Sequence, residues 1–94
     1  MAIKVEVFSS DSCPHCPGAV KVAEEAKADL TDLDIELEVV NINTEENRKR
    51  AIDYQIMAVP TIVIDGQVEF IGAPSKEEFV AKLKSISIFL SFSL

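Results

Sequence analysis

Two segments in the first half of the chain alternate between apolar and charged residues. Residues 3–7 and residues 35–39 carry apolar side chains at every second position, with charged side chains between them. A period of two places the apolar set on one face of a sheet, so each segment is predicted to form a β-strand. Between these strands, apolar residues recur at helical spacing, and we predict a helix over about residues 14–30.

Two further helices are indicated by capping residues. Asn43 or Thr44 can cap a helix that runs through about Tyr54, because two glutamates follow in the first turn, where the helix dipole favours negative charge. Ser75 and Glu78 have the spacing of a capping box, in which each side chain accepts a hydrogen bond from the backbone N–H of the other. Apolar residues follow on one helical face, so a last helix is predicted there.

A hairpin is predicted between these two helices. Residues 61–64 and 67–71 are strand-like, and Asp65-Gly66 between them fits a two-residue turn. The predicted order is therefore β-α-β-α-β-β-α. Two parallel strands joined by a right-handed crossover, followed by an antiparallel hairpin, give an α/β fold. Its four-stranded mixed sheet should be covered by helices on both faces.

The length of the chain, 94 residues, suits one compact domain with one modest core. We assign this domain to residues 1–84. Residues 85–94 contain no charged side chain and interleave four serines with six apolar residues. We expect this tail to be a frayed extension of the last helix or a disordered end, and the alternative is a sticky segment that packs on a neighbouring molecule.

The charge balance disfavours some partners. The 16 acidic and 9 basic residues give a formal net charge of −7, which repels nucleic acids and anionic membrane surfaces. The N-terminus shows no secretory signal, and no apolar run approaches the roughly 20 residues of a membrane-spanning helix. We therefore expect a monomeric cytoplasmic protein with free thiols.

The candidate chemistry lies in Cys13-Pro14-His15-Cys16, at the predicted junction of the first strand and the first helix. At a helix N-terminus, Cys13 meets unpaired N–H groups and the positive end of the helix dipole, which favour the reactive thiolate. Cys16 follows one turn later, within reach of Cys13. Pro14 fits the first helical position. His15 adds a donor or a positive charge that can tune the thiolate, and the alternative is an exposed turn residue without such a role.

Two residues near this motif are expected to disfavour the Cys13 thiolate or the start of the helix. Asp11 would disfavour a Cys13 thiolate if its carboxylate lay near the sulfur, because like charges repel. Pro17 would remove one early hydrogen bond of the helix, since proline has no backbone N–H.

A zinc site is the rival interpretation of the cysteine pair. Structural zinc takes four ligands, whereas this chain has two cysteines and one histidine, so a closed site would need a second subunit. We therefore predict thiol–disulfide redox chemistry without a metal or an organic cofactor. A non-catalytic docking domain is a third possibility that the residues leave open.

The motifs and their order resemble those of the thioredoxin superfamily. A strand, Cys-Pro-His-Cys, a helix, and Ala-Val-Pro-Thr at residues 58–61 before a hairpin carry the resemblance, which covers about residues 2–84. The short length is similar to that of glutaredoxins, and the likeness is greatest to the small thioredoxin/glutaredoxin-like proteins known from archaea. The resemblance implies that Cys13 is the nucleophile and that Cys16 resolves the mixed disulfide.

The resemblance also implies a cis peptide bond between Val59 and Pro60, packed against the cysteine pair. Such a turn would aim the Val59 backbone outward, where an extended segment of the substrate could pair with it. Ordinary core packing of the Val59 side chain is the alternative interpretation.

Several positions depart from the family patterns. Many thioredoxins have a buried acid where this chain has Val7, and a tryptophan where it has Ser12. Glutaredoxins place a basic residue just before their cysteine motif, where this chain has Ser10-Asp11-Ser12, so the carboxylates of glutathione are poorly supplied with charge partners here. We therefore predict an enzyme that reduces protein disulfides, with a dithiol or flavoprotein reductase as electron donor. A glutathione-dependent glutaredoxin is the alternative.

Overall fold

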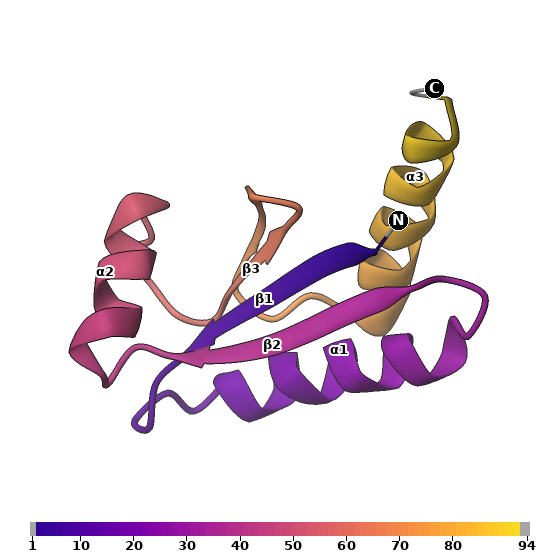
Figure 1. Cartoon of the computed structure of the whole chain (residues 1–94). Helices are drawn as coiled ribbons and strands as arrows, with labels where there is room; N and C mark the ends of the chain where they lie inside the picture. The colour runs from indigo at the N-terminus through magenta and orange to yellow at the C-terminus, as the bar shows by residue number, and fades with distance from the viewer. Residues whose placement is uncertain (1, 93–94) are drawn as a thin grey trace.

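The computed structural model describes residues 2–92, and within that range the chain forms one mixed sheet with helices on both faces (Figure 1). The elements in chain order are β1 (Ile3–Ser9), α1 (Cys16–Asp29), β2 (Ile35–Asn41), α2 (Glu45–Asp53), β3 (Thr61–Ile64), β4 (Gln67–Ile71) and α3 (Lys76–Phe92). The strand order is β2-β1-β3-β4, with β1 parallel to β2 and β3 antiparallel to both of its neighbours. The predicted α/β architecture is confirmed.

The two faces of the sheet have separate apolar cores. On one face, Val5 and Val7 of β1 belong to the same buried cluster as Phe79 and Leu83 of α3 and three of the four alanines of α1. Small side chains along α1 let that helix lie close to the strands. The cluster on the opposite face, beneath α2, consists of Phe8, Val40, Ala51 and Val63. Alternate side chains of β1 therefore face two different cores, one on each side of the sheet, and not one core and the solvent.

The α2 face also holds a charged contact. Glu6 of β1 is only 3% exposed, and it accepts hydrogen bonds from the Arg50 guanidinium of α2 and from the Tyr54 hydroxyl. Arg50 also donates two hydrogen bonds, of 2.9 and 3.0 Å, to Glu38 of β2. Its bonds to Glu38 and Glu6 hold the pKa of Arg50 above its ordinary value, and the bond from Arg50 lowers the pKa of Glu38. Ionic as well as apolar contacts therefore fasten α2 to the sheet.

The capping and turn residues do what their local sequence predicts. The Thr44 hydroxyl accepts a hydrogen bond from the first turn of α2. Asp65 and Gly66 have φ angles of 50° and 84°, the left-handed conformation that a two-residue hairpin turn requires at both positions. The Ser75 hydroxyl accepts from the Glu78 N–H at 3.1 Å, and the Glu78 carboxylate accepts from the Ser75 N–H at 3.2 Å. The capping box is thus complete.

The last helix is longer than the predicted domain. α3 extends to Phe92 and projects past the sheet (Figure 1), so residues 85–92 of the predicted tail continue the helix. Residues 93–94 of that tail lie outside the described residues. The division of the chain at residue 84 stays a prediction. Within the described part of the chain, no helix is long and apolar enough to cross a membrane.

Candidate active site

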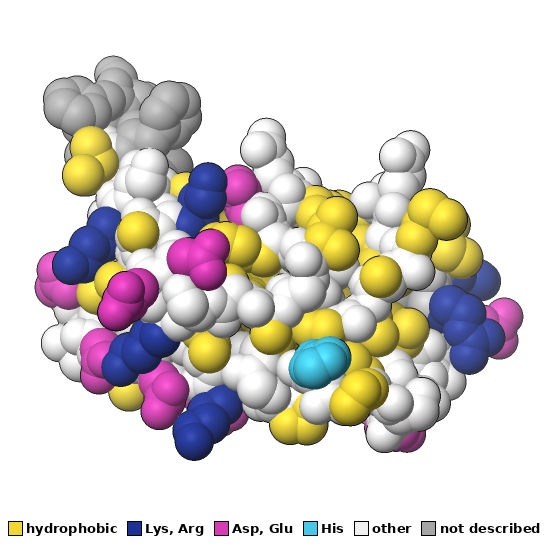
Figure 2. Space-filling model, turned by 180° about the vertical axis from the view of Figure 1, so that it is seen from behind, with side chains coloured by type: hydrophobic (Ala, Val, Ile, Leu, Met, Phe, Trp, Pro, Cys, Tyr) yellow, Lys and Arg dark blue, Asp and Glu magenta, His cyan; other side chains and the backbone are white. Residues whose placement is uncertain are grey.

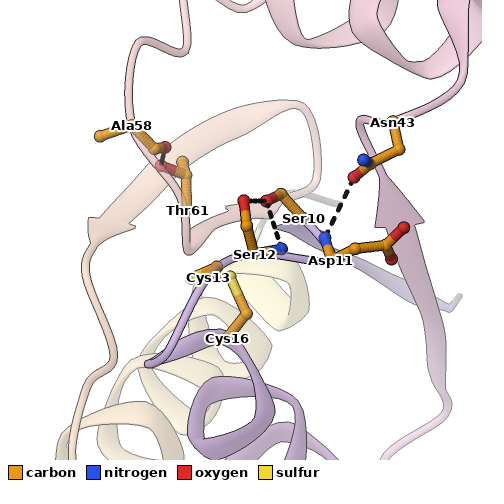
Figure 3. The surroundings of a disulfide bond; sticks show 8 residues. All are labelled: Ser10, Asp11, Ser12, Cys13, Cys16, Asn43, Ala58 and Thr61. Carbon is orange, nitrogen blue, oxygen red and sulfur yellow. Dashed lines mark hydrogen bonds between the residues drawn. A yellow bond between two sulfur atoms is a disulfide. The ribbon is translucent and has the colours of Figure 1, made fainter.

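The two cysteines lie between the end of β1 and the start of α1 (Figure 3). Cys13 and Cys16 form a disulfide, with their Cα atoms 5.4 Å apart, so the structure shows the oxidised pair and not the free thiols that the sequence predicts. Cys16 is the first residue of α1 and is 3% exposed, whereas Cys13 is half-buried in the preceding loop. Cys13 is therefore the more accessible of the two.

α1 begins two residues later than the sequence pattern predicts. His15 is the N-cap residue, and its side chain makes no capping hydrogen bond. The prediction that Pro14 takes the first helical position is wrong, because Pro17 supplies the proline of the first turn, where its fixed φ is already helical. A backbone N–H in that turn has no intrahelical acceptor, so Pro17 removes no helical hydrogen bond either. Pro14 and His15 lie exposed between the two cysteines.

A second loop completes the surroundings of the disulfide. The Val59–Pro60 peptide bond is cis, and its neighbours Ala58 and Thr61 are drawn beside the cysteine pair in Figure 3. The Thr61 hydroxyl donates to the Ala58 carbonyl, and the Gly72 N–H donates to the Pro60 carbonyl, both at 2.7 Å. Pro60 is buried and Val59 is half-buried. Within residues 2–92, the Val59 backbone forms no hydrogen bond, which leaves its N–H and C=O available.

Three polar residues near the cysteines form a ring of hydrogen bonds that the sequence reasoning missed. The Asp11 N–H donates to Asn43 Oδ1 at 3.0 Å, the Asn43 N–H donates to Asn41 Oδ1 at 2.8 Å, and Asn41 Nδ2 donates to Asp11 Oδ1 at 2.7 Å. Figure 3 shows the Asp11 side chain directed away from the two sulfurs. Asparagines that follow a strand indicate a turn, but they do not reveal which distant loop they bind.

The surface around the motif is uncharged and partly apolar. In Figure 2 the histidine lies among apolar and uncharged side chains, and the charged side chains gather towards the two ends of this face. Met57 is 98% exposed and Ile71 is 77% exposed. Both belong to a cavity of about 180 Å³ whose lining comprises Gln55, Ile56, Met57, Ala58, Thr61, Val68 and Ile71. An apolar hollow therefore lies next to the cis proline loop.

A second, larger hollow lies over the ionic contact of α2. It measures about 530 Å³ and includes Glu6, Arg50 and Tyr54 in its lining. Glu6, Arg50 and Tyr54 already bind one another there, as described above. Across the described residues, no group of three or more His, Cys, Asp or Glu side chains could hold a metal ion.

Comparisons with known proteins agree with this geometry. A family model described as a thioredoxin domain matches residues 1–84. The chain is 52% identical over 82 residues to a thioredoxin of Methanocaldococcus jannaschii, a match that covers 87% of this chain and 93% of the relative. It is 47% identical over 78 residues to a probable thioredoxin of Methanothermobacter marburgensis, covering 83% of this chain and 88% of that protein.

A solved structure shows the same fold at low sequence identity. A thioredoxin-2 described as a component of a malaria parasite protein secretion machinery superposes with a TM-score of 0.71 at 17% identity. The superposition covers 89% of this chain and 82% of the other.

Proposed function

The chain belongs to the thioredoxin family, and from that premise we propose that Cys13 attacks the disulfide of a protein substrate and that Cys16 completes the exchange. Family membership makes the protein a thiol–disulfide oxidoreductase that acts by dithiol–disulfide exchange. The difference in burial supports the division of roles, because Cys13 is half-buried and Cys16 is 3% exposed. An attacking sulfur must be reached by the substrate, whereas a resolving sulfur must reach only its neighbour.

The proposed cycle begins with the reduced pair. The Cys13 thiolate attacks one sulfur of the substrate disulfide, and the other substrate sulfur leaves as a thiolate that takes up a proton. Cys16 then loses its proton and attacks Cys13 Sγ, which breaks the mixed disulfide and releases the second substrate thiol. Two electrons and two protons pass to the substrate, and the enzyme retains the Cys13–Cys16 disulfide that the structure shows. The exchange requires no metal or organic cofactor.

His15 and Pro14 are the proposed tuning residues. His15 is the N-cap of α1 and is exposed beside the disulfide, so its protonated ring would favour a thiolate on Cys13. Pro14 restricts the backbone between the two cysteines, since its ring fixes φ. The first effect acts on the charge of Cys13 and the second on the geometry of the two sulfurs.

Val59 and Pro60 are the proposed binding residues for the substrate backbone. The unbonded N–H and C=O of Val59 favour pairing with an extended segment, as in other recognition by strand addition. The exposed Met57 and Ile71 side chains nearby favour a polypeptide with apolar residues around its disulfide. A protein is a better match to this surface than a small charged thiol.

The proposed electron donor is a dithiol or flavoprotein reductase in preference to glutathione. Glutathione presents two carboxylates, which need cations or unpaired N–H groups. The Ser75 and Glu78 N–H groups at the start of α3 are occupied by the capping box, and no charged side chain surrounds the histidine in Figure 2. We propose that the enzyme is cytoplasmic, because a reducing compartment keeps such a dithiol ready to react. We also propose that it is a monomer.

The division of roles is tested by replacing each cysteine in turn. Cys13→Ser should abolish the reduction of insulin, because no nucleophile remains at the accessible position. Cys16→Ser should instead accumulate mixed disulfides with insulin, which gel electrophoresis without reductant would detect. If Cys13→Ser still traps insulin through Cys16, the assignment is reversed.

The choice of donor is tested on the same oxidised protein. Reduction by NADPH with a flavoprotein thioredoxin reductase should be fast and saturable, whereas reduction by millimolar glutathione should be slow. Faster, saturable turnover with glutathione would establish the glutaredoxin alternative instead.

A further inference from the structure

The ring of hydrogen bonds between Asp11, Asn41 and Asn43 joins two loops that are distant in sequence. Asp11 and Asn41 are 30 residues apart, yet Asn41 Nδ2 lies 2.7 Å from Asp11 Oδ1. Asn41 itself is fixed on both sides, because it is the last residue of β2, in register with Ser9, and its carbonyl accepts from Asn47 Nδ2 at 3.0 Å. The Asp11 carboxylate is therefore bound to a rigid part of the sheet.

The position of this carboxylate matters because Asp11 precedes Cys13 by two residues. A carboxylate near the sulfur would oppose formation of the thiolate, since two negative charges repel. The ring instead directs the Asp11 side chain away from the sulfurs (Figure 3). His15 lies exposed in the same loop. Within residues 10–16, Asp11 supplies the carboxylate, so its position decides whether a negative charge of this loop lies near Cys13.

We propose that Asn41 and Asn43 are positioning residues that hold the Asp11 carboxylate away from Cys13 and so favour its thiolate. The inference rests on the proposed role of Cys13 as the nucleophile. Asn41 Nδ2 binds the carboxylate directly, and Asn43 Oδ1 holds the backbone N–H of the same residue. The turn around the cysteines has its own support, because the Ser12 N–H donates to Ser10 Oγ and the Cys13 N–H to the Ser10 carbonyl. Loss of the ring should therefore release the Asp11 side chain without unfolding the loop.

The first measurement is the titration of the Cys13 thiol in a Cys16→Ser background, where the thiolate absorbance belongs to Cys13 alone. Asn41→Ala should raise the pKa of this thiol by about half a unit, the size expected for a carboxylate that approaches within several ångströms in a largely solvated loop. Adding Asp11→Asn to Asn41→Ala should restore the original titration. Asp11→Asn alone should have a smaller effect, because the carboxylate is already held away.

The second measurement is the exchange equilibrium with glutathione in the protein that keeps both cysteines. The oxidised enzyme and two glutathione molecules give the dithiol enzyme and one glutathione disulfide. The Cys13 thiolate stabilises the reduced form of the enzyme. At a pH above the pKa of Cys13 in both the original protein and the variant, Asn41→Ala should therefore make this reduction about threefold less favourable. The disulfide would then be less oxidising.

Asn47→Ala is the matched control. It removes the donor to the Asn41 carbonyl, but the pairing of Asn41 with Ser9 in the sheet and its contact with Asp11 stay in place, so neither the titration nor the equilibrium should change. If Asn41→Ala disturbs folding, Asn43→Ala provides the same test through the backbone contact of Asp11.

Two results would overturn the proposal. One is a lower melting temperature of Asn41→Ala with an unchanged thiol pKa, which would make the ring purely structural. The other is a raised pKa that Asp11→Asn fails to reverse. Reversed roles of Cys13 and Cys16 would appear separately, as substrate trapping by Cys13→Ser.

Discussion

The two sides of β1 are held by different kinds of contact. Towards α1 and α3, Val5 and Val7 lie in a wholly apolar cluster that includes Phe79 of the last helix. Towards α2, the same strand presents Glu6, which Arg50 and Tyr54 bind in a mixed polar and apolar layer. Apolar burial is insensitive to pH, whereas ionic contacts vary with it. The contacts of β1 with α1 and α3 should therefore not depend on pH, whereas its contacts with α2 should. Three variants measure how much each side contributes to the free energy of unfolding.

The largest effect is expected on the apolar face. Phe79 is 1% exposed and packs edge-on against Phe70, with ring centroids 6.1 Å apart. Phe79→Ala should lower the free energy of unfolding by about 3–5 kcal/mol, because it removes buried apolar area and leaves a cavity. Urea denaturation at pH 7 would measure this loss. Glu77→Ala, at an exposed position of the same helix, is the control. An equal loss of unfolding free energy in that variant would contradict the assignment of Phe79 to the core.

A smaller effect is expected on the α2 face. Arg50→Met should lower the free energy of unfolding by about 2 kcal/mol, because among residues 2–92 it leaves the buried Glu6 with only the Tyr54 hydroxyl as a partner. The Arg50 side chain is itself 31% exposed, which keeps the expected loss below that of Phe79→Ala. Denaturation of the double variant Arg50→Met/Glu6→Gln should show partial recovery, and its absence would remove the unpaired charge as the cause.

The smallest effect is a change with pH at Glu38. Its bond from Arg50 lowers the pKa from the ordinary 4.5, so its stabilising contribution is present above that pH and disappears as the pH falls through the folded-state pKa. The side chain is 47% exposed, so the contribution at pH 7 should be under about 1 kcal/mol. Unfolding of Glu38→Gln should therefore converge with that of the original protein in acid. A difference that stays constant from pH 7 to pH 3 would contradict the ionic origin.

Local signals predicted the fold because each acts within a few residues. Thr44 and the Ser75–Glu78 pair satisfy backbone groups of their own segment. Asp65 and Gly66 reverse the chain through their own positive φ angles, so all these roles follow from local sequence. The cysteine pair could be found in the same way, since its motif is contiguous.

The features that the sequence does not predict depend on contacts between segments that lie far apart along the chain. Glu6 is charged and alternates with apolar residues, and its burial depends on Arg50, which lies 44 residues away. The sequence predicts the start of α1 two residues too early because both Pro14 and Pro17 suit a first helical turn, and in the structure Pro17 occupies it. The contact between Asp11 and Asn41 likewise spans 30 residues. Strand and helix periods carry no information about such pairings.

The uncharged surface around His15 also affects how molecules meet this protein. The formal net charge of −7 belongs to the whole chain, but the area around the histidine in Figure 2 carries none of it. A negatively charged protein that approaches this face should be repelled less near the histidine than at the charged ends of the face, so the charge distribution should bias the orientation of encounters. Added salt shortens the Debye length, so this bias should weaken. The rate of productive collision should then depend more on the shapes of the two surfaces than on the electric field of the enzyme.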